Sequence, residues 1–162
     1  LIGMAVPSTK ALLLMEYTTE SDMVVKVTGF QWGWHYDYME ENVSFYSMLA
    51  TPQSQITGSE TKGENYLLEV NNHLVLPLGK KVRFLLTAKD VIHAWWVPQL
   101  GGKKDAIPGF INEMWVRADE TGIFRGQCAE LCGKDHGYMP IVVEVVDDAQ
   151  YQAWLEGRRN QG

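Results

Sequence analysis

Positive charge is scarce in this sequence. Its 14 lysines and arginines stand against 20 acidic residues, which gives a formal net charge of -6. This balance disfavours nucleic acid as a partner and favours a basic one. Internal repeats and low-complexity tracts are also missing, and a chain of 162 residues suits one domain with a single sizeable core.

No apolar run is long enough to cross a bilayer. The best candidate, 1–15, is mostly apolar but contains Pro7 and Lys10, and it is shorter than the roughly 20 residues that a membrane-spanning helix needs. Composition leaves two interpretations open for this segment. It is either the emerging end of a membrane helix or a short amphipathic segment that lies on the domain.

Aromatic residues are abundant, with six tryptophans and seven tyrosines. Residues 26–38 alternate as a single strand should, and the alternation puts one aromatic row on one face: Phe30, Trp32, Trp34, Tyr36 and Tyr38. Most of this row is expected in the core. Trp32, at the rim, is a candidate anchor for a docking partner.

The rest of the chain predicts an all-β sandwich with a short C-terminal helix. Apolar runs bounded by turn residues predict further strands near 44–49, 66–70, 73–76, 81–88, 110–118, 122–126 and 141–146. Polar segments rich in glycine or proline predict long loops at 39–63 and 99–108. Residues 147–157 carry apolar side chains at helical spacing, which predicts the helix.

One short stretch, 126–139 (GQCAELCGKDHGYM), concentrates ligands for a soft metal. It contains both cysteines of the chain, and its candidate ligands are Cys128, Cys132, His136 and Met139. Sulfur and imidazole select copper over calcium or magnesium. A single blue-copper site uses one thiolate, so two thiolates suggest a bridged pair of copper ions. Each ion then needs its own imidazole, and the stretch supplies only one.

A second imidazole must come from His35, His73 or His93. We predict His93, because the sequence around it, VIHAWWVP, would exclude water and fix the ring. His35 falls on the polar face of the aromatic strand and His73 at an exposed turn, so both are interpreted as surface residues. Two other interpretations of the cysteines stay open, a disulfide bond and a zinc site. Neither uses the thioether of the nearby methionine.

Four separated motifs, GFQWGW, VIHAWWVP, DAIPG and GQCAELCGKDHGYMPI, resemble subunit II of haem-copper cytochrome c oxidases, and the resemblance covers about 1–154. It implies a cupredoxin-like Greek-key β-sandwich over 21–147, preceded at 1–20 by the end of a transmembrane helix and a linker. A C-terminal helix and tail would follow at 148–162. The domain would lie on the periplasmic side of a bacterial inner membrane or in the mitochondrial intermembrane space.

The resemblance also implies a dinuclear copper A centre. The thiolates of Cys128 and Cys132 would bridge the two ions, and His93 and His136 would bind one ion each. The weak outer ligands would be Met139 and the backbone carbonyl of Glu130. In this family the Glu130 carboxylate would also reach a magnesium ion at the border with subunit I.

The implied function is that of the electron-accepting subunit of the oxidase enzyme. Electrons would enter at Trp32 from reduced cytochrome c and pass through copper A towards haem in subunit I, where oxygen is reduced. We also predict a negative rim around Trp32, which would steer a basic cytochrome c. Its members would be Asp37, Glu40, Glu41 and Asp90.

The sequence departs from the commonest family pattern at two positions, with Phe30 where many members have histidine and Asn71 where many have an acidic residue. A different docking surface is therefore expected. The competing functions are a copper A domain of a nitrous oxide reductase, a copper-free quinol-oxidase subunit II and a disulfide-stapled binding module. The DAIPG motif argues against the first of these, and the retained cysteines argue against the second.

Overall fold

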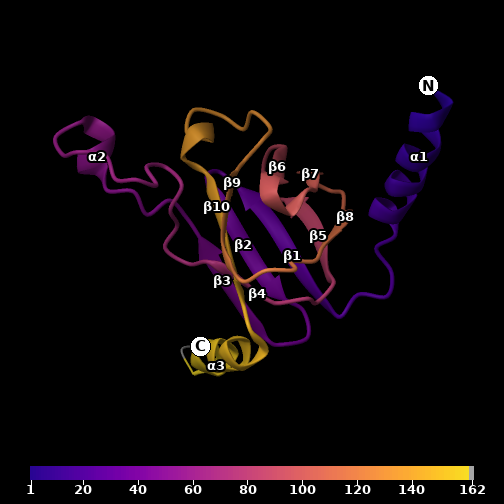
Figure 1. Ribbon diagram of the computed structural model, residues 1–162. Coiled ribbons are helices and arrows are strands. Elements are labelled where there is room, and N and C mark those ends of the chain that lie inside the picture. The colour runs from indigo at the N-terminus through magenta and orange to yellow at the C-terminus, as the bar shows by residue number, and fades with distance from the viewer. Residues whose placement is uncertain (161–162) are drawn as a thin grey trace.

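Two β-sheets enclose the core in the computed structural model, which describes residues 1–160 (Figure 1). The larger sheet has the order β3-β2-β1-β5-β8, formed by β1 (Met23–Phe30), β2 (Gly33–Tyr38), β3 (Val43–Ser47), β5 (Val82–Ala88) and β8 (Asn112–Val116). The smaller sheet has the order β4-β10-β9, formed by β4 (Leu74–Pro77), β9 (Gly122–Gln127) and β10 (Pro140–Val146). A separate hairpin joins β6 (His93–Trp96) to β7 (Lys103–Ala106). The predicted all-β sandwich is confirmed.

The helices lie at the periphery: α1 (Ile2–Glu16), α2 (Gln53–Thr57) and α3 (Asp148–Arg159), with 3-10 turns η1 (Pro98–Leu100) and η2 (His136–Tyr138). The predicted C-terminal helix is α3. It starts at Asp147, whose carboxylate accepts a hydrogen bond from the backbone N–H of Gln150 at 2.8 Å, as in a capping box. Tyr151 and Leu155 are buried against the sandwich. Residues 161–162 of the predicted tail lie outside the described residues.

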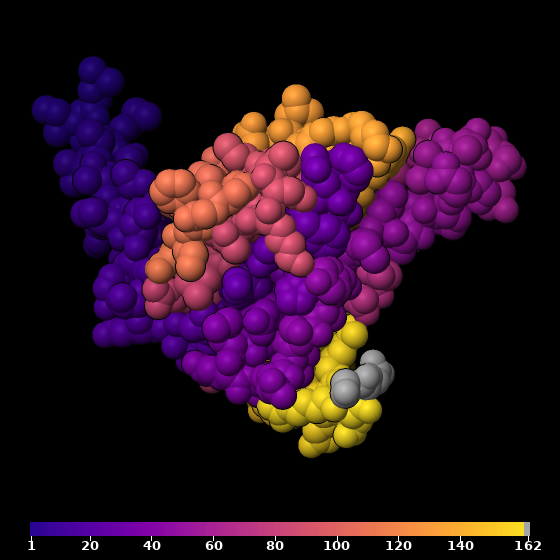
Figure 2. All heavy atoms as spheres, turned by 180° about the vertical axis from the view of Figure 1, so that it is seen from behind, coloured from indigo at the N-terminus to yellow at the C-terminus, as the bar shows by residue number. Residues whose placement is uncertain are grey.

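The N-terminal segment forms α1, which stands away from the sandwich (Figure 2). None of its residues is buried, so the alternative of an amphipathic segment lying on the domain is wrong. The described part of the chain contains no helix with the length and apolar character that crossing a membrane requires. The end of α1 is tied to the domain, because the indole N–H of Trp115 donates to the Leu14 carbonyl at 3.0 Å. Lys81 Nζ donates to the carbonyls of Tyr17 and Thr19 at 2.8 Å.

The aromatic row is not a single strand, and this prediction is wrong. β1 and β2 form an antiparallel hairpin in which Phe30 pairs with Gly33 across a turn at Gln31 and Trp32. Residues that pair across the two strands lie on the same face of the sheet. The core-facing positions are therefore odd-numbered in β1 and even-numbered in β2. Phe30 therefore lies on the outer face, with its ring centroid 5.5 Å from that of Tyr46. Trp34, Tyr36 and Tyr38 keep their predicted place in the core.

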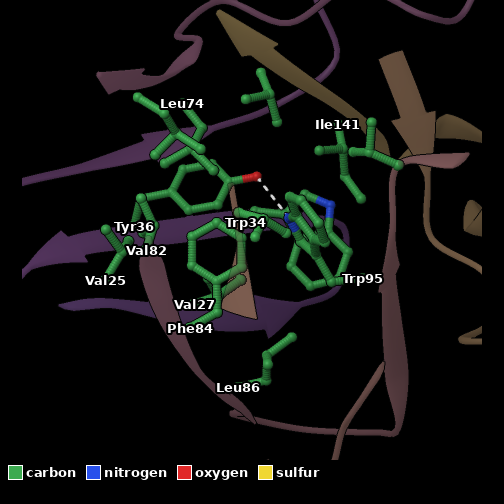
Figure 3. Close-up of a cluster of buried hydrophobic side chains, with 14 of the residues drawn as sticks. Val25, Val27, Trp34, Tyr36, Leu74, Val82, Phe84, Leu86, Trp95 and Ile141 are labelled. Carbon is green, nitrogen blue, oxygen red and sulfur yellow. Dashed lines mark hydrogen bonds between the residues drawn. The ribbon is translucent and has the colours of Figure 1, made fainter. Parts of the chain in front are cut away.

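The core fills the space between the sheets (Figure 3). Tyr36 from β2 and Trp95 from β6 meet there, and the Trp95 indole N–H donates to the Tyr36 hydroxyl at 3.4 Å. Tyr38 donates its hydroxyl proton to the Val75 carbonyl at 2.7 Å. These large aromatic side chains are fully buried, and each contributes at least the roughly 1.5 to 3 kcal/mol of a buried Val, Leu, Ile, Phe or Met. The core thus holds one end of β6 against β2.

Three predicted segments differ from the structure. Residues 66–70 form no strand: Tyr66 and Leu67 lie in a turn, where Leu67 has a φ of 61°, and only an isolated bridge joins Val70 to Leu49. The predicted loop at 39–63 contains α2, and the one at 99–108 contains η1 and β7. Residues 50–69, called here the arm, project from the sandwich on the side away from α1 (Figure 2).

Candidate metal centre

Three segments meet at one end of the sandwich: the start of β6, the turn between β1 and β2, and residues 128–139 between β9 and β10, called here the metal loop (Figure 1). Backbone hydrogen bonds hold the metal loop in place. The Cys128 N–H donates to the Met139 carbonyl at 3.0 Å, which closes the loop on itself. The Ala129 N–H donates to the Ala94 carbonyl at 2.9 Å, which ties the loop to β6 beside His93.

Two thiols and two imidazoles come together in this region. The sulfur atoms of Cys128 and Cys132 are 3.8 Å apart. Cys128 Sγ lies 3.9 Å from His93 Nδ1, and Cys132 Sγ lies 3.4 Å from His136 Nδ1. Each thiol therefore has its own imidazole. The ligand atoms of His93 and both cysteines all lie within 4.8 Å of one another, and these three residues are buried.

Two weaker donors complete the arrangement. The Glu130 carbonyl oxygen is 3.3 Å from Cys128 Sγ, and Met139 Sδ is 4.0 Å from Cys132 Sγ. Met139 is fully buried at 1% exposure, so its thioether has no contact with bulk water. The Glu130 residue is exposed. A central sulfur pair is thus flanked on both sides by an imidazole and a weak donor.

This donor set fits a soft metal such as copper. Both cysteines are free thiols, and their sulfur separation of 3.8 Å is far longer than the roughly 2.05 Å of a disulfide bond. The disulfide alternative is therefore not what this structure forms. A tetrahedral zinc ion takes about four ligands. Six donors, two of them thiols with separate imidazoles, are more than one such ion uses and match the soft ligands that copper favours.

The two thiols differ in acidity. Burial alone would raise the pKa of Cys128, but hydrogen bonds with His93 and with the backbone at Glu130 and Ala94 outweigh burial and lower that pKa. Burial raises the pKa of Cys132, and the neighbouring charge of a Cys128 thiolate raises it further. The first proton leaves this pair more readily than the second. A metal cation removes that penalty, because it binds both groups as thiolates.

His93 is the most enclosed of the candidate ligands. It is 0% exposed, and its Nε2 lies 2.9 Å from Asp90 Oδ1. Burial alone would lower the pKa of His93, but its contacts with Cys128 and Asp90 outweigh burial and raise that pKa. Gly29 on β1 makes room for the ring, because a Cβ there would lie 2.8 to 3.1 Å from three of its atoms. No pattern in the sequence indicates the roles of Gly29 and Asp90 at this ring.

Trp32 lies at the β1–β2 turn, beside the metal loop. Its indole N–H donates to the Cys132 carbonyl at 3.1 Å, and Gln31 Nε2 donates to the same oxygen at 2.9 Å. Gly133 allows this close approach, because it adopts a φ of 117° and a Cβ there would lie 3.0 Å from Gln31 Nε2. Lys134 Nζ lies 5.4 Å from the centroid of the Trp32 ring. The indole is half-buried, so one side of it remains open to a partner.

The other two histidines lie outside the cluster. His35 is half-buried on the outer face of β2, with its ring centroid 4.6 Å from that of Tyr46. His73 Nδ1 is 2.8 Å from Glu144 Oε2, and the side chain of His73 is 31% exposed. His73 directly follows the bend at Asn71 and Asn72, as predicted, but it is half-buried instead of exposed. Neither ring approaches the thiols.

The predicted acidic rim around Trp32 is wrong for part of its members. Glu41 pairs with Arg159 of α3, at the end of the sandwich opposite the metal loop (Figure 1). Asp37 pairs in register with Lys26 and Ser44, near that same far end of β2. Asp90 does lie beside the turn, and its Oδ2 accepts a hydrogen bond from the Gln31 N–H at 2.8 Å.

Comparison with known families identifies relatives along most of the chain. The family described as cytochrome c oxidase subunit II, periplasmic domain, matches residues 23–146. The chain is 45% identical over 157 residues to a probable cytochrome c oxidase subunit 2 of Rickettsia prowazekii (strain Madrid E), covering 96% of this chain and 48% of that protein. It is 40% identical over 172 residues to cytochrome c oxidase subunit 2 of Cereibacter sphaeroides, covering 98% and 57%. The chain thus spans about half the length of these relatives.

Solved structures agree with this comparison. The periplasmic domain of subunit II of cytochrome oxidase of Bradyrhizobium japonicum is 41% identical, with a TM-score of 0.79, and the match covers 89% of this chain and 98% of that one. A second match, with 40% identity, a TM-score of 0.72 and coverage of 88% and 94%, is a mixed disulfide intermediate between a thioredoxin-like protein and subunit II of cytochrome c oxidase. The predicted cupredoxin-like sandwich is confirmed. The chain belongs to the cytochrome c oxidase subunit II family, whose periplasmic domain it matches.

Proposed function

We propose that this chain accepts one electron at a time from reduced cytochrome c at a dinuclear copper A centre and passes it towards haem in subunit I. The observation that carries the proposal is the paired arrangement of donors, in which each of two adjacent thiols has its own imidazole and a weak outer donor. Two copper ions bound there would share one electron through the two thiolate bridges.

The chain's own residues supply binding, rigidity and exclusion of water. The thiolates of Cys128 and Cys132 and the imidazoles of His93 and His136 would hold the copper ions, which would supply the one-electron chemistry. Burial of both thiols keeps water from the bridges, since Cys128 is 5% and Cys132 is 2% exposed. The anchored metal loop limits ligand movement when the charge of the centre changes, which favours rapid electron transfer.

Glu130 has two groups that could bind metal ions, its backbone carbonyl and its side-chain carboxylate. Its backbone carbonyl, close to Cys128 Sγ, would be a weak outer copper ligand, as would Met139 Sδ near Cys132. Its exposed carboxylate is free to bind a magnesium ion at the border with subunit I. Carboxylate oxygen is the ligand type that magnesium prefers.

Electrons enter through Trp32. Its indole N–H is bonded to the carbonyl of Cys132, so a short path of one hydrogen bond and a few covalent bonds leads from the ring to a bridging sulfur. A groove of about 490 Å³ lies beside the indole, between the metal loop and the arm, with Met48, Ile56 and Tyr138 in its walls. The net charge of -6 favours a basic cytochrome c as the partner that docks there.

Subunit I is the proposed partner on the exposed apolar surface near the metal. Leu131 of the metal loop is 77% exposed, and Ile92 beside His93 is 44% exposed. Apolar side chains exposed next to a functional centre are typical of a protein interface. We further propose that α1 is the emerging end of a transmembrane helix, since Leu13 and Met15 are 68% and 55% exposed. The domain would then sit in the periplasm or the mitochondrial intermembrane space.

The competing functions have less support. A match to the oxidase subunit II family over 23–146 favours the oxidase over a nitrous oxide reductase. A copper-free quinol-oxidase subunit has no use for two cysteines that meet with two histidines. A disulfide-stapled module is disfavoured because both cysteines are free thiols.

Stopped-flow mixing of the copper-loaded chain with reduced cytochrome c tests the proposal. We expect the haem of cytochrome c to be oxidised as the copper absorption band disappears. The rate of this electron transfer should fall with added salt, which screens charges beyond a Debye length of about 8 Å. Trp32→Ala should slow the transfer severely and leave the copper spectrum unchanged. Trp96→Ala is the matched control, because this indole is 39% exposed on β6. Wild-type speed in Trp32→Ala would remove Trp32 from the path.

A further inference from the structure

We propose that Asp90 is a positioning residue whose single carboxylate joins the turn that carries Trp32 to the imidazole of His93. The inference rests on the proposed function, because the metal is what His93 would be positioned for. Asp90 lies three residues before His93, in the connection between β5 and β6. Both of its carboxylate oxygens face structural partners rather than only solvent.

One oxygen fixes the histidine. Asp90 Oδ1 lies 2.9 Å from His93 Nε2 and also accepts a hydrogen bond from the Val91 N–H at 2.7 Å. A ring held through Nε2 has one free nitrogen left, Nδ1, and this is the atom that faces Cys128 Sγ at 3.9 Å. A carboxylate bonded to the far nitrogen of a ligand histidine fixes its tautomer and its orientation. Asp90 therefore selects which nitrogen meets the metal.

The other oxygen fixes the turn. Asp90 Oδ2 accepts the backbone N–H of Gln31 at 2.8 Å. The side chain of Gln31 in turn donates to the Cys132 carbonyl, the same oxygen to which the indole of Trp32 is bonded. His93, Asp90, Gln31 and Cys132 thus form a continuous chain of contacts that links one side of the thiol pair to the other. The indole that receives electrons is held by the same chain.

The surroundings of Asp90 are those of a structural carboxylate. Its side chain is 32% exposed, and it makes three close contacts with the chain. His93, Val91 and Gln31 all contact this one carboxylate, at 2.7 to 2.9 Å. A surface acid that only steers a partner needs none of these contacts. Asp90 was predicted as such a rim acid, and the structure gives it a second role.

A set of three variants tests the inference: Asp90→Ala, Asp90→Asn and Asp37→Asn. Asp37→Asn is the matched control, because it removes one negative charge near the far end of β2. Asp90→Ala removes all three contacts. Asp90→Asn keeps the shape, but its amide group turns a donor towards the Gln31 N–H or the His93 ring, so at least one contact is lost.

The first measurement is copper retention by the folded chain against a chelator, with the absorption and electron paramagnetic resonance spectra of the bound copper. Loss of a group that orients a metal ligand typically weakens metal binding about 10- to 100-fold. We expect a loss of this size and an altered copper spectrum for Asp90→Ala, and a smaller loss for Asp90→Asn. Asp37→Asn should match the wild type. Copper binding and spectra that are the same in all three variants would overturn the inference.

The second measurement needs no metal. In the copper-free, reduced chain, hydrogen exchange at the indole N–H of Trp32 reports how firmly the turn is held. We expect faster exchange in Asp90→Ala than in Asp37→Asn, because releasing Gln31 loosens the turn. Equal exchange rates would contradict the link between Asp90 and Trp32. A wild-type chain that binds no copper pair would refute the proposed function, and this exchange experiment separates that failure from a failure of the Asp90 link.

Discussion

His93 and His136 approach the two thiols with very different support. His93 is the first residue of a β-strand, is 0% exposed, and has a carboxylate on its far nitrogen. His136 is the first residue of a one-turn 3-10 helix and is only half-buried. Its contact with Cys132 Sγ, at 3.4 Å, is made from within the metal loop itself. One imidazole belongs to the sandwich and the other to the loop.

The two sides of the cluster therefore differ in what holds the imidazole. The sandwich holds the His93 ring, since Gly29 on β1 leaves room for it and Asp90 contacts its far nitrogen. The metal loop holds the His136 ring, which is half-buried. The two thiols connect the two imidazoles, because each thiol is close to one imidazole and to the other sulfur atom.

The largest effect is expected from replacing either of the two cysteines, whose thiols lie between the two imidazoles. Cys128→Ser and Cys132→Ser should each abolish the coloured two-copper centre, because a hydroxyl is a poor bridging ligand for copper. Absorption spectra and metal analysis after copper addition measure this loss. Circular dichroism should show that both variants stay folded. A variant that kept two copper ions and the wild-type spectrum would mean that the sulfur atoms are not bridges.

The next largest effect is a difference in stability between variants of the two histidines. In the copper-free, reduced chain, His93→Ala should lower the free energy of unfolding by about 2 to 4 kcal/mol, since it leaves a cavity in the packed interior. His136→Ala should lower it by less than about 1 kcal/mol, because that ring is partly exposed. Urea unfolding of both variants gives the comparison. Equal losses would show that the two imidazoles do not differ in structural support.

The smallest effect is expected at the weak donor of the metal loop. Met139→Leu should keep two copper ions and shift the reduction potential, because an axial thioether tunes a copper site more than it binds the ion. The fold should tolerate the change at a cost below about 1.5 kcal/mol, since leucine nearly conserves the buried volume. Metal analysis and a potentiometric titration measure both quantities. Loss of one copper ion would make Met139 an essential ligand instead.

Much of the candidate site could be predicted from the sequence, because most of its donors stand close together along the chain. Cys128, Cys132, His136 and Met139 lie on one loop, so their meeting requires little knowledge of the fold. The more distant His93 was found through the apolar residues around it, and its ring is indeed fully buried beside Cys128. The strands were mostly predictable too, since alternating burial follows their sequence pattern.

What could not be predicted depends on tertiary placement. The alternating aromatic pattern runs through the turn at Gln31 and Trp32 without a break, so nothing in it revealed that Phe30 faces outwards. The sequence around Asp90 does not distinguish it from an ordinary surface acid, and only the fold brings its carboxylate to Gln31. Glu41 was misplaced for the same reason, because the length and direction of β2 carry it to α3 at the far end.

The central claim is that two copper ions sit between the paired thiols. The most direct test is the ratio of copper to protein in the reconstituted chain, measured together with the hyperfine pattern in electron paramagnetic resonance. We expect two copper ions per chain and a pattern produced by one electron shared equally between two copper nuclei. A single copper ion per chain, with the hyperfine pattern of one nucleus, would contradict it.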